Sequence, residues 1–407
     1  MKIGMILDAS FPPDPRVENE SISLISAGHE VHLFCLAYSP DFKEKQVYKG
    51  IHVYRYYCNR LNYKLSALAY TLPFYHKFLR KHLKSFLADA NVDILHVHDI
   101  QSARAVFQLN HQYKIILDLH ENRPEIMKYY PHVNSLRGRF LISPEKWRSF
   151  EKKYIEQAYR VVVVTEPAKR HYMEITRSAP DKFIVVPNTI RKAFYESPSY
   201  HEEIITRYKD TYNLLYLGDT GLRRGALELI QAIAIVRTKI TNVKLIMVGK
   251  SQEDKILRQE IAQLNLHDHV KLTGWQNFET FQSYLKISKI GFSPLHRNLH
   301  HDTTFANKIF QYLSFGLPIV VSDATAQKEV VEQFNCGYSY PANNVQALAE
   351  CIVKLYEHPE NYQRMSEQAI LAVRTKYNWE TTSAELINFY ANLSSQEPYE
   401  RHLEPNH

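Results

Sequence analysis

The stretch HHDTTFANKIFQYLSFGLPIVVSD, from His300 to Asp323, shows most directly how this chain folds. It starts with polar residues, continues with a helical pattern that Gly316 ends, and closes with the apolar run PIVVSD. A glycine followed by a proline commonly ends a helix, and a short run of branched apolar residues is typical of a buried strand. The stretch therefore predicts a polar loop, a helix and a buried strand in succession.

The same alternation of apolar runs and helical patterns extends over most of the 407 residues. The runs predicted to be strands are 3–7, 31–37, 93–99, 114–120, 160–165, 183–188, 212–218, 243–249, 270–275, 290–295 and 318–323. Apolar strands separated by helices indicate parallel sheets that are covered on both faces. A chain of this length is also too long for one ordinary core.

We therefore predict an α/β fold with two Rossmann-like, doubly wound domains. The first covers residues 1–190 and the second residues 211–375; they are separated by a linker over 191–210 and followed by a C-terminal helix and tail over 376–407. Ligands bind such sheets beyond the carboxyl ends of the strands, so the two binding edges are expected to face one another across a cleft.

Composition is that of an ordinary globular protein. Hydrophobic residues make up 45% and charged residues 23%, and the net charge of +7 favours anionic ligands but is too small for a nucleic-acid-binding protein. The four cysteines have no metal-binding spacing and are expected to be buried and reduced. The first residues form a strand pattern rather than a secretion signal, and no run approaches the ~20 apolar residues of a membrane span. A cytosolic protein is expected.

The sequence LGDTGLRRG (217–225) places a glycine-containing turn between a predicted strand and a predicted helix. Free N–H groups at a helix start bind anions, Gly218 and Gly221 permit tight turns, and Arg224 can bind a diphosphate through two hydrogen bonds. The alternative is a glycine turn with solvated arginines. Because the GxGxxG spacing is missing, a hydride-transfer enzyme is not expected.

In the opening stretch, Asn307 and Lys308 lie just inside the predicted helix. A lysine at a helix start opposes the helix dipole, and this arrangement is better tolerated where an anion binds. The alternative is an amphipathic helix with Ile309 and Phe310 in the core and Lys308 in water.

Polar residues follow two of the predicted strands, in HVHD (96–99) and LHEN (119–122). His96 and His98 are expected on one face of their strand because they are two residues apart. A metal site is one interpretation, and a hydrogen-bonding role for His120 at the ligand is the other. The chain has no Asp-x-Asp motif, so a metal-bridged diphosphate is not expected.

Two other segments each allow two interpretations. SFPPDPRVENE (10–20), with Arg16 and Glu18, is predicted to be either a loop that contacts the acceptor or a phosphate, or a rigid connector. Residues 74–87 are basic, contain no acid and have apolar residues at helical spacing. This helix is predicted either to lie on an anionic membrane surface at the inner face of the cell membrane, or to pack in the core with a solvated basic face.

Taken together, these motifs resemble the family 4 glycosyltransferases, retaining enzymes with the two-domain GT-B fold. The resemblance is carried, in the family's order, by FPPDPRVENE, DILHVHD, ILDLHE, IVVPNTI, LYLGDTGLRRG, LIMVG, VKLTGW and the opening stretch. The first of these motifs is similar to that of bacterial surface-polysaccharide enzymes.

The resemblance implies a UDP- or GDP-sugar donor and a glycan or lipid-linked acceptor, with no metal or other cofactor. Three residues match catalytic positions of the family: Arg224 at the donor diphosphate, Lys308 before the active-site helix and His120 beside the donor sugar. The implied donor-binding residues are Gly218, Gly221, Thr304, Asn307 and Gln311. The implied acceptor-side residues are Arg16, Glu18, Asp99 and Glu121.

The chain departs from the family at three positions. Thr304 and Gln311 stand where the family has two glutamates, and Asp219 replaces a second basic residue in the diphosphate loop. A glutamine can still accept a hydrogen bond from the donor ribose, but the loss of charge is expected to weaken donor binding about ten- to thirty-fold.

These departures leave two alternatives to an active glycosyltransferase. One is a non-catalytic GT-B protein that binds a glycan or a partner enzyme. The other is a sugar-nucleotide 2-epimerase, for which Glu121 and Asp99 are the acid/base candidates.

Overall fold

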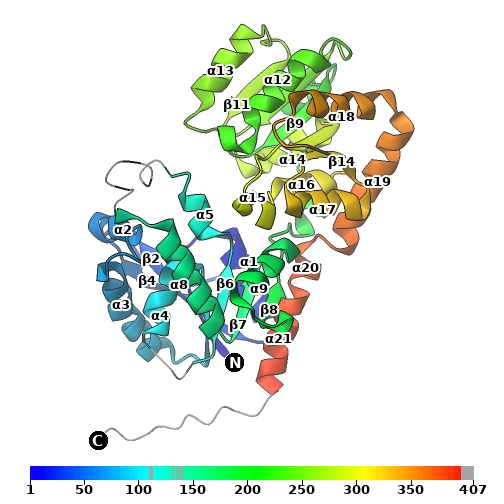
Figure 1. The fold of residues 1–407 in the computed structure, drawn as a ribbon. Helices are drawn as coiled ribbons and strands as arrows, with labels where there is room; N and C mark the ends of the chain where they lie inside the picture. Colours follow the sequence, from blue (N-terminus) through cyan, green and yellow to red (C-terminus); the bar gives the residue numbers. More distant parts are fainter. Residues whose placement is uncertain (110–112, 131–132, 134, 136–137, 139–140, 396–407) are drawn as a thin grey trace, which may run out of the picture. The chain divides into compact units, whose positions relative to one another are not determined.

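The computed structural model describes residues 1–395 except 110–112, 131–132, 134, 136–137 and 139–140. The chain forms two compact units, Met1–Val186 together with the chain from Ser383 onward, and Pro187–Thr382 (Figure 1). These boundaries differ from the predicted ones. The predicted linker 191–210 belongs to the second unit and contains two short helices, α10 (Ala193–Glu196) and α11 (Glu202–Arg207).

The first unit is built on a sheet whose described strands run in the order β3-β4-β2-β1-β5-β6-β7-β8. All neighbours are parallel except β3 and β4. The strands are β1 (Lys2–Ile6), β2 (Glu30–Ala37), β3 (Lys45–Tyr48), β4 (Ile51–Tyr57), β5 (Ile94–His98), β6 (Ile115–Leu119), β7 (Arg160–Val163) and β8 (Phe183–Val185). Strands β3 and β4 were not predicted; the alternating burial of β3 marks an edge strand, which gives a weaker apolar signal.

The order of the strands reverses between β1 and β5, which are neighbours although β2, β3 and β4 lie between them in the sequence. Such a reversal is where doubly wound sheets bind their ligands. The helices of this unit are α1 (Pro15–Ser26), α2 (Arg60–Ser66), α3 (Phe74–Ala90), α4 (Ile100–Phe107), α5 (Arg123–Met127), α8 (Pro144–Gln157), α9 (Glu166–Thr176) and the C-terminal α21 (Ala384–Ser395).

The second unit has a fully parallel sheet in the described part of the chain, in the order β11-β10-β9-β12-β13-β14. This is the order of a dinucleotide-binding sheet, and its reversal lies between β9 and β12. The strands are β9 (Tyr212–Leu217), β10 (Val243–Val248), β11 (Val270–Gly274), β12 (Ile290–Ser293), β13 (Ile319–Ser322) and β14 (Gly337–Tyr340).

The helices of the second unit include the predicted helix of the opening stretch, which is α16 (Lys308–Ser314). Besides α10 and α11, the other described α-helices are α12 (Ala226–Val236), α13 (Asp254–Gln263), α14 (Phe281–Ile287), α15 (Leu299–Thr303), α17 (Thr325–Phe334), α18 (Val345–Glu357), α19 (Pro359–Thr375) and α20 (Trp379–Thr382). Two doubly wound α/β units and a helical C-terminal region confirm the predicted fold class. All four cysteines are free, and all but Cys351 are buried.

Helix α3 contains the basic segment 74–87, which was predicted either to lie on a membrane surface or to pack in the core. Its side chains Leu79, Leu83 and Phe86 are fully buried in the core of the first unit, while Phe74 is 54% exposed. The structure thus favours the core-packing alternative for most of the apolar face that suggested membrane contact. Within the described residues, no helix is both long and apolar enough to cross a bilayer.

Candidate active site

The loop that follows β9 in the second unit, predicted to bind the donor, depends on two glycines. Gly218 has a φ of +104°, a conformation that side chains with a Cβ rarely adopt. Gly225 has a φ of +72°, and a Cβ there would lie 1.7 Å from the carbonyl oxygen of Pro294. Only glycine therefore lets α12 begin directly beside the segment that follows β12.

The backbone amides of this loop already bind carboxylates. The N–H of Gly221 donates to Oδ1 of Asp219 over 3.0 Å, and the N–H of Leu222 donates to Oε2 of Glu253 over 2.6 Å. Asp219 also lies 3.8 Å from the guanidinium of Arg224. These two N–H groups are thus occupied by carboxylates of the chain itself, at a place where backbone amides are suited to bind anions.

Lys308 lies next to this loop, and its ammonium group is buried. Its Nζ sits 3.5 Å from the centre of the Tyr216 ring and makes no hydrogen bond to any described residue. Burial and the charge of Arg224 hold the pKa of Lys308 well below its usual value, against the weaker pull of Asp219. The structure therefore brings Arg224 and Lys308 together and buries the Lys308 amine instead of leaving it in water. The lysine has no carboxylate partner in the described chain.

Tyr312 holds α16 in this place. Its hydroxyl accepts a hydrogen bond from the N–H of Leu217 over 2.8 Å and donates to the carbonyl of Phe292 over 3.2 Å. It thereby ties the helix to β9 and β12 at once. Its ring fits against Gly291, where a Cβ would lie 2.2 Å from the ring. Buried hydrogen bonds of this kind fix the start of α16, and with it the position of Lys308.

The other residues of the opening stretch lie around the start of α16. The hydroxyl of Thr304 donates to the carbonyl of His300 over 2.7 Å and so ends α15. Asn307 is exposed at the start of α16, and Gln311 is half-buried one turn further along. Neither side-chain amide makes a hydrogen bond within the described part of the chain, so both are available to a ligand.

The first unit contains a buried charge network that the sequence did not predict. The guanidinium of Arg16 lies 2.8 Å from Asp118 and 2.9 Å from Glu20, and it donates to the carbonyl of Val186 over 3.0 Å. All three charged side chains are at most 4% exposed. Arg16 is therefore held in the protein interior, and this placement does not support its predicted contact with an acceptor. Arginine appears exposed in sequence patterns because nothing local reveals a carboxylate 102 residues away.

His120 lies at the edge of this network and faces a pocket. Its Nε2 is 2.9 Å from Oδ2 of Asp118, and its backbone N–H donates to Asp99 over 3.2 Å. Burial alone would lower the pKa of His120, but the carboxylates of Asp118 and Asp99 outweigh it and raise the pKa to about 9. His120 is therefore a cation at neutral pH. Asp118, in contrast, stays ionised despite burial because Arg16 and His120 hold its pKa well below the usual range.

His96 and His98 share a face, as predicted, with ring centres 4.7 Å apart. Together with Glu20 and Asp118 they offer four buried ligand atoms within 4.8 Å of one another, which is compatible in distance with a metal ion. However, Arg16 already forms ion pairs with both carboxylates of this group. A second cation beside that guanidinium would be repelled, so the chemistry of the cluster does not fit a metal site.

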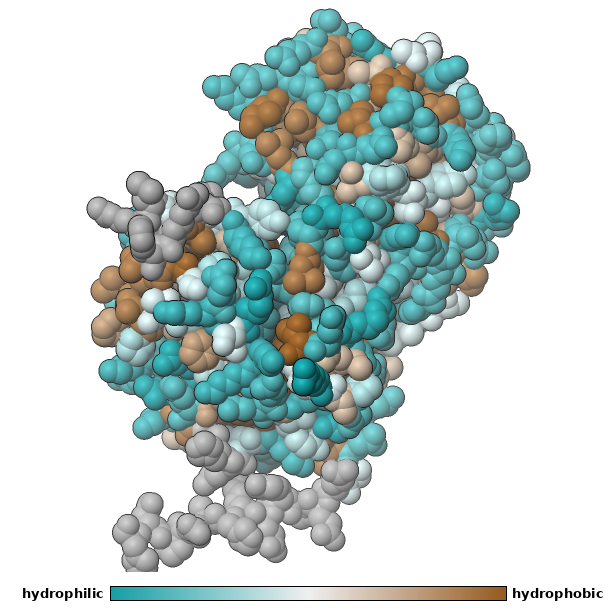
Figure 2. Space-filling model, in the orientation of Figure 1, coloured by the Kyte–Doolittle hydropathy of each residue, from teal (hydrophilic) through white to brown (hydrophobic). Residues whose placement is uncertain are grey.

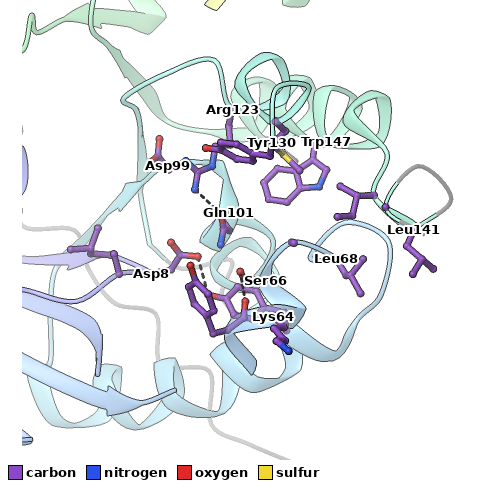
Figure 3. Close-up of a pocket in the computed structure, with 18 of the residues that line it drawn as sticks. Asp8, Lys64, Ser66, Leu68, Asp99, Gln101, Arg123, Tyr130, Leu141 and Trp147 are labelled. Carbon is purple, nitrogen blue, oxygen red and sulfur yellow. Dashed lines mark hydrogen bonds between the residues drawn. The ribbon is translucent and has the colours of Figure 1, made fainter. Parts of the chain in front are cut away.

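Of the remaining predicted acceptor-side residues, one lines a pocket and two form ion pairs. Asp99 lines the pocket, whereas Glu121 is bound to Arg123 at 2.7 Å and Glu18 to Lys49 at 2.5 Å. The pocket has a volume of about 870 Å³ and lies beyond β1 and β5, at the reversal of the strand order (Figure 3). This is within the usual size range of small-molecule sites.

Sequence reasoning missed several polar residues of this pocket, among them Asp8, Gln101 and Arg123. Asp8 follows the first apolar run just as Asp99 follows another, so the same signal could have found it. Gln101 and Arg123 lie at the starts of α4 and α5 and carry no such signal.

Comparison with known proteins identifies the class. Residues 16–193 match the family model "Glycosyltransferase Family 4", and residues 201–371 match the model "Glycosyl transferases group 1". A phosphatidyl-myo-inositol mannosyltransferase of Mycolicibacterium smegmatis is 23% identical over 403 residues, which is 97% of this chain and 94% of that protein. An alpha-D-kanosaminyltransferase of Streptomyces kanamyceticus is 21% identical over 272 residues, which is 64% of this chain and 67% of that protein.

Solved structures agree with this result at the level of the fold. The sucrose-phosphate synthase of Thermosynechococcus elongatus superposes with a TM-score of 0.76 at 18% identity, covering 97% of this chain and 99% of the other. HepE of Anabaena in complex with UDP gives a TM-score of 0.67 at 15% identity, covering 96% and 100%. The two family matches together span both units, and the chain belongs to the family 4 glycosyltransferases with the GT-B fold.

Proposed function

We propose that the protein is a retaining, metal-independent glycosyltransferase that moves a hexose or N-acetylhexosamine from a nucleotide-diphosphate-sugar to a surface glycan or lipid-linked acceptor. The second unit holds the donor and the first unit holds the acceptor. The observation that supports a diphosphate donor best is the buried ammonium of Lys308, which has no anionic partner in the described chain and lies beside Arg224 and an anion-binding loop.

In the proposed reaction an acceptor hydroxyl attacks the anomeric carbon on the face from which the diphosphate leaves. The bond to the diphosphate oxygen breaks, the new glycosidic bond forms, and the leaving phosphate takes the hydroxyl proton. Negative charge builds on the leaving group, and Arg224 and Lys308 stabilise it. The protonated His120 is suited to hydrogen-bond a hydroxyl of the transferred sugar.

A donor panel tests this function. We expect incubation with UDP- and GDP-linked hexoses and N-acetylhexosamines to release nucleoside diphosphate from one donor, at an unchanged rate in excess EDTA. The anomeric configuration of the product, measured by NMR, should equal that of the donor sugar. Release of no nucleoside diphosphate from any donor with alkyl glycoside and lipid-linked acceptors would contradict the proposal, and inversion would contradict the retaining mechanism.

Substitution of Gln311 by glutamate tests whether the protein is an enzyme with weakened donor binding or a non-catalytic binding protein. We expect Gln311→Glu to lower the donor Kd about ten- to thirty-fold, because a carboxylate binds a ribose hydroxyl more strongly than an amide does. Calorimetric titration with nucleoside diphosphate measures the Kd, with Gln333→Glu, on α17, as the matched control. Tighter binding in a protein that remains inactive would instead favour a binding protein.

A further inference from the structure

The pocket of the first unit has two chemically different ends. Figure 3 shows Asp8, Asp99, Gln101 and Arg123 on one side, with Tyr130 beside Arg123, and Leu68, Trp147 and Leu141 on the other. The polar end lies at the carboxyl edge of β1 and β5, next to His120, and is therefore the end where a reacting hydroxyl belongs. The apolar end is formed by the chain after α2 and by the beginning of α8.

The charges of the polar end compensate one another. Arg123 is bound to Glu121 at 2.7 Å and to Gln101 at 3.2 Å, so its guanidinium is already occupied by a carboxylate. Asp8 accepts a hydrogen bond from Tyr75 over 2.9 Å, and burial raises its pKa to about 7 despite the nearby Arg123. Asp99 adds another acceptor. Over the whole lining, the basic side chains of Lys64, His120 and Arg123 are matched in number by the carboxyl groups of Asp8, Asp14 and Asp99. The pocket therefore offers hydrogen bonds to hydroxyl groups but no surplus positive charge for a phosphate.

The apolar end continues toward the surface. Leu141, which lines the pocket, is 46% exposed, and Leu61 on the neighbouring α2 is 66% exposed. In Figure 2 an apolar area lies on the first unit where Figure 1 shows α2. An apolar group seated on Leu68 and Trp147 can therefore extend outward along apolar side chains instead of ending in water.

We propose that this pocket binds an amphiphilic acceptor, in which a neutral, hydroxylated head occupies the polar end and an apolar group attached to it occupies the end formed by Leu68, Met127 and Trp147. This inference rests on the proposed function, because it identifies the class of acceptor for that reaction. It narrows the acceptor to a glycoside or polyol with an apolar substituent. An alkyl chain and an aromatic ring share this chemistry.

Binding of simple probes to the donor-free protein tests the inference without requiring turnover. The probes are methyl, n-octyl and phenyl β-D-glucoside and n-octyl phosphate, each titrated calorimetrically below its micelle concentration. We expect octyl glucoside to bind at least tenfold more tightly than methyl glucoside and more tightly than octyl phosphate. A phenyl glucoside as tight as the octyl compound would indicate an aromatic aglycone, and a weaker one an alkyl chain.

Two variants test whether the preference for octyl over methyl glucoside arises in this pocket. Leu68→Gln should abolish the preference for octyl over methyl glucoside. Leu371→Gln, at an exposed leucine on α19 of the second unit, is the matched control and should retain the preference. Equal binding of the octyl and methyl compounds by the wild type, or a preference unchanged by Leu68→Gln, would overturn the inference. Tighter binding of octyl phosphate than of octyl glucoside would contradict the proposal that the head group is neutral. None of these results depends on donor turnover. A failure of this inference can therefore be distinguished from a failure of the proposed function.

Discussion

Replacing Lys308 by methionine is expected to stabilise the protein and to remove most of its transferase activity. The two effects have one cause. The Nζ of Lys308 is buried on the ring of Tyr216 without a hydrogen-bond partner among the described residues, and an unsatisfied buried polar group costs about 1–3 kcal/mol. Methionine has a similar length and no charge, so the free energy of unfolding should rise by roughly that amount. The same change removes a cation from the proposed diphosphate site, and kcat/KM should fall about 10²- to 10³-fold.

The pH dependence of this stabilisation follows from the lowered pKa of Lys308. Because the folded state binds the lysine proton less well than the unfolded state, the cost of the wild-type lysine is greatest at pH values below its folded pKa. The cost shrinks as pH rises toward the unfolded pKa of about 10.4. The stability difference between Lys308→Met and the wild type should therefore narrow with increasing pH.

Thermal and urea unfolding between pH 6 and 10, together with donor turnover, measure both effects. Lys328→Met is the matched control, because Lys328 is 43% exposed and lies 3.4 Å from Glu332 on the same unit. It should change stability by less than about 1 kcal/mol and leave activity intact. A destabilised or fully active Lys308→Met protein would contradict the assignment of Lys308 to the diphosphate.

Replacing Asp118 by asparagine is expected to be strongly destabilising. The substitution keeps the shape of the side chain but leaves the guanidinium of Arg16 buried with a single carboxylate, Glu20. Loss of one partner of a buried ion pair costs about 3–5 kcal/mol. The neighbouring His120 also loses the carboxylate that does most to keep it protonated, so its pKa should fall from about 9. Activity should fall with it, most of all above neutral pH.

The pH profile of stability distinguishes these two contributions. The lowered pKa of Asp118 means that its stabilising contribution is present above the unfolded pKa of about 3.9 and is lost as pH falls. The raised pKa of His120 means that its contribution is complete below the unfolded pKa of about 6.5 and is lost as pH rises toward about 9. The difference between the wild type and Asp118→Asn should therefore be largest between about pH 4 and 6.5.

Urea unfolding from pH 3 to 10 measures this profile, with Asp89→Asn as the matched control. Asp89 forms a surface ion pair with Lys45 at 2.8 Å and is 40% exposed, so its loss should cost less than about 1 kcal/mol at any pH. If the two asparagine variants had equal stability, the buried network would not have the structural role assigned to it here. NMR titration of His120 gives an independent readout of its pKa in both proteins.

Local patterns predicted most of the fold because strands and helices have short periods that a few neighbouring residues reveal. Each predicted apolar run coincides with a strand of one of the two sheets, and Gly218, Gly225 and Gly316 lie where the chain turns. The strands β3, β4 and β14 and the unit boundaries were missed. The C-terminal chain was predicted as one tail, whereas α20 packs with the second unit and α21 with the first, where Tyr390 contacts His96 at 2.8 Å. Such a return of the chain has no local signature.

The sequence by itself determined the order of most secondary structure elements, the doubly wound class and the position of the glycine turn between β9 and α12, because each depends on residues that are neighbours in the chain. Only the tertiary structure decided which of the charged residues are buried. Arg16 was expected near an acceptor and lies in the interior with Asp118, while Asp8 joins Asp99 in a pocket because β1 and β5 are neighbours in the sheet. Lys308 was expected at a helix start, and its burial on Tyr216 follows from the position in which Tyr312 holds that helix. The electrostatic environment of a side chain depends on partners that are distant in sequence, and strand order brings those partners together.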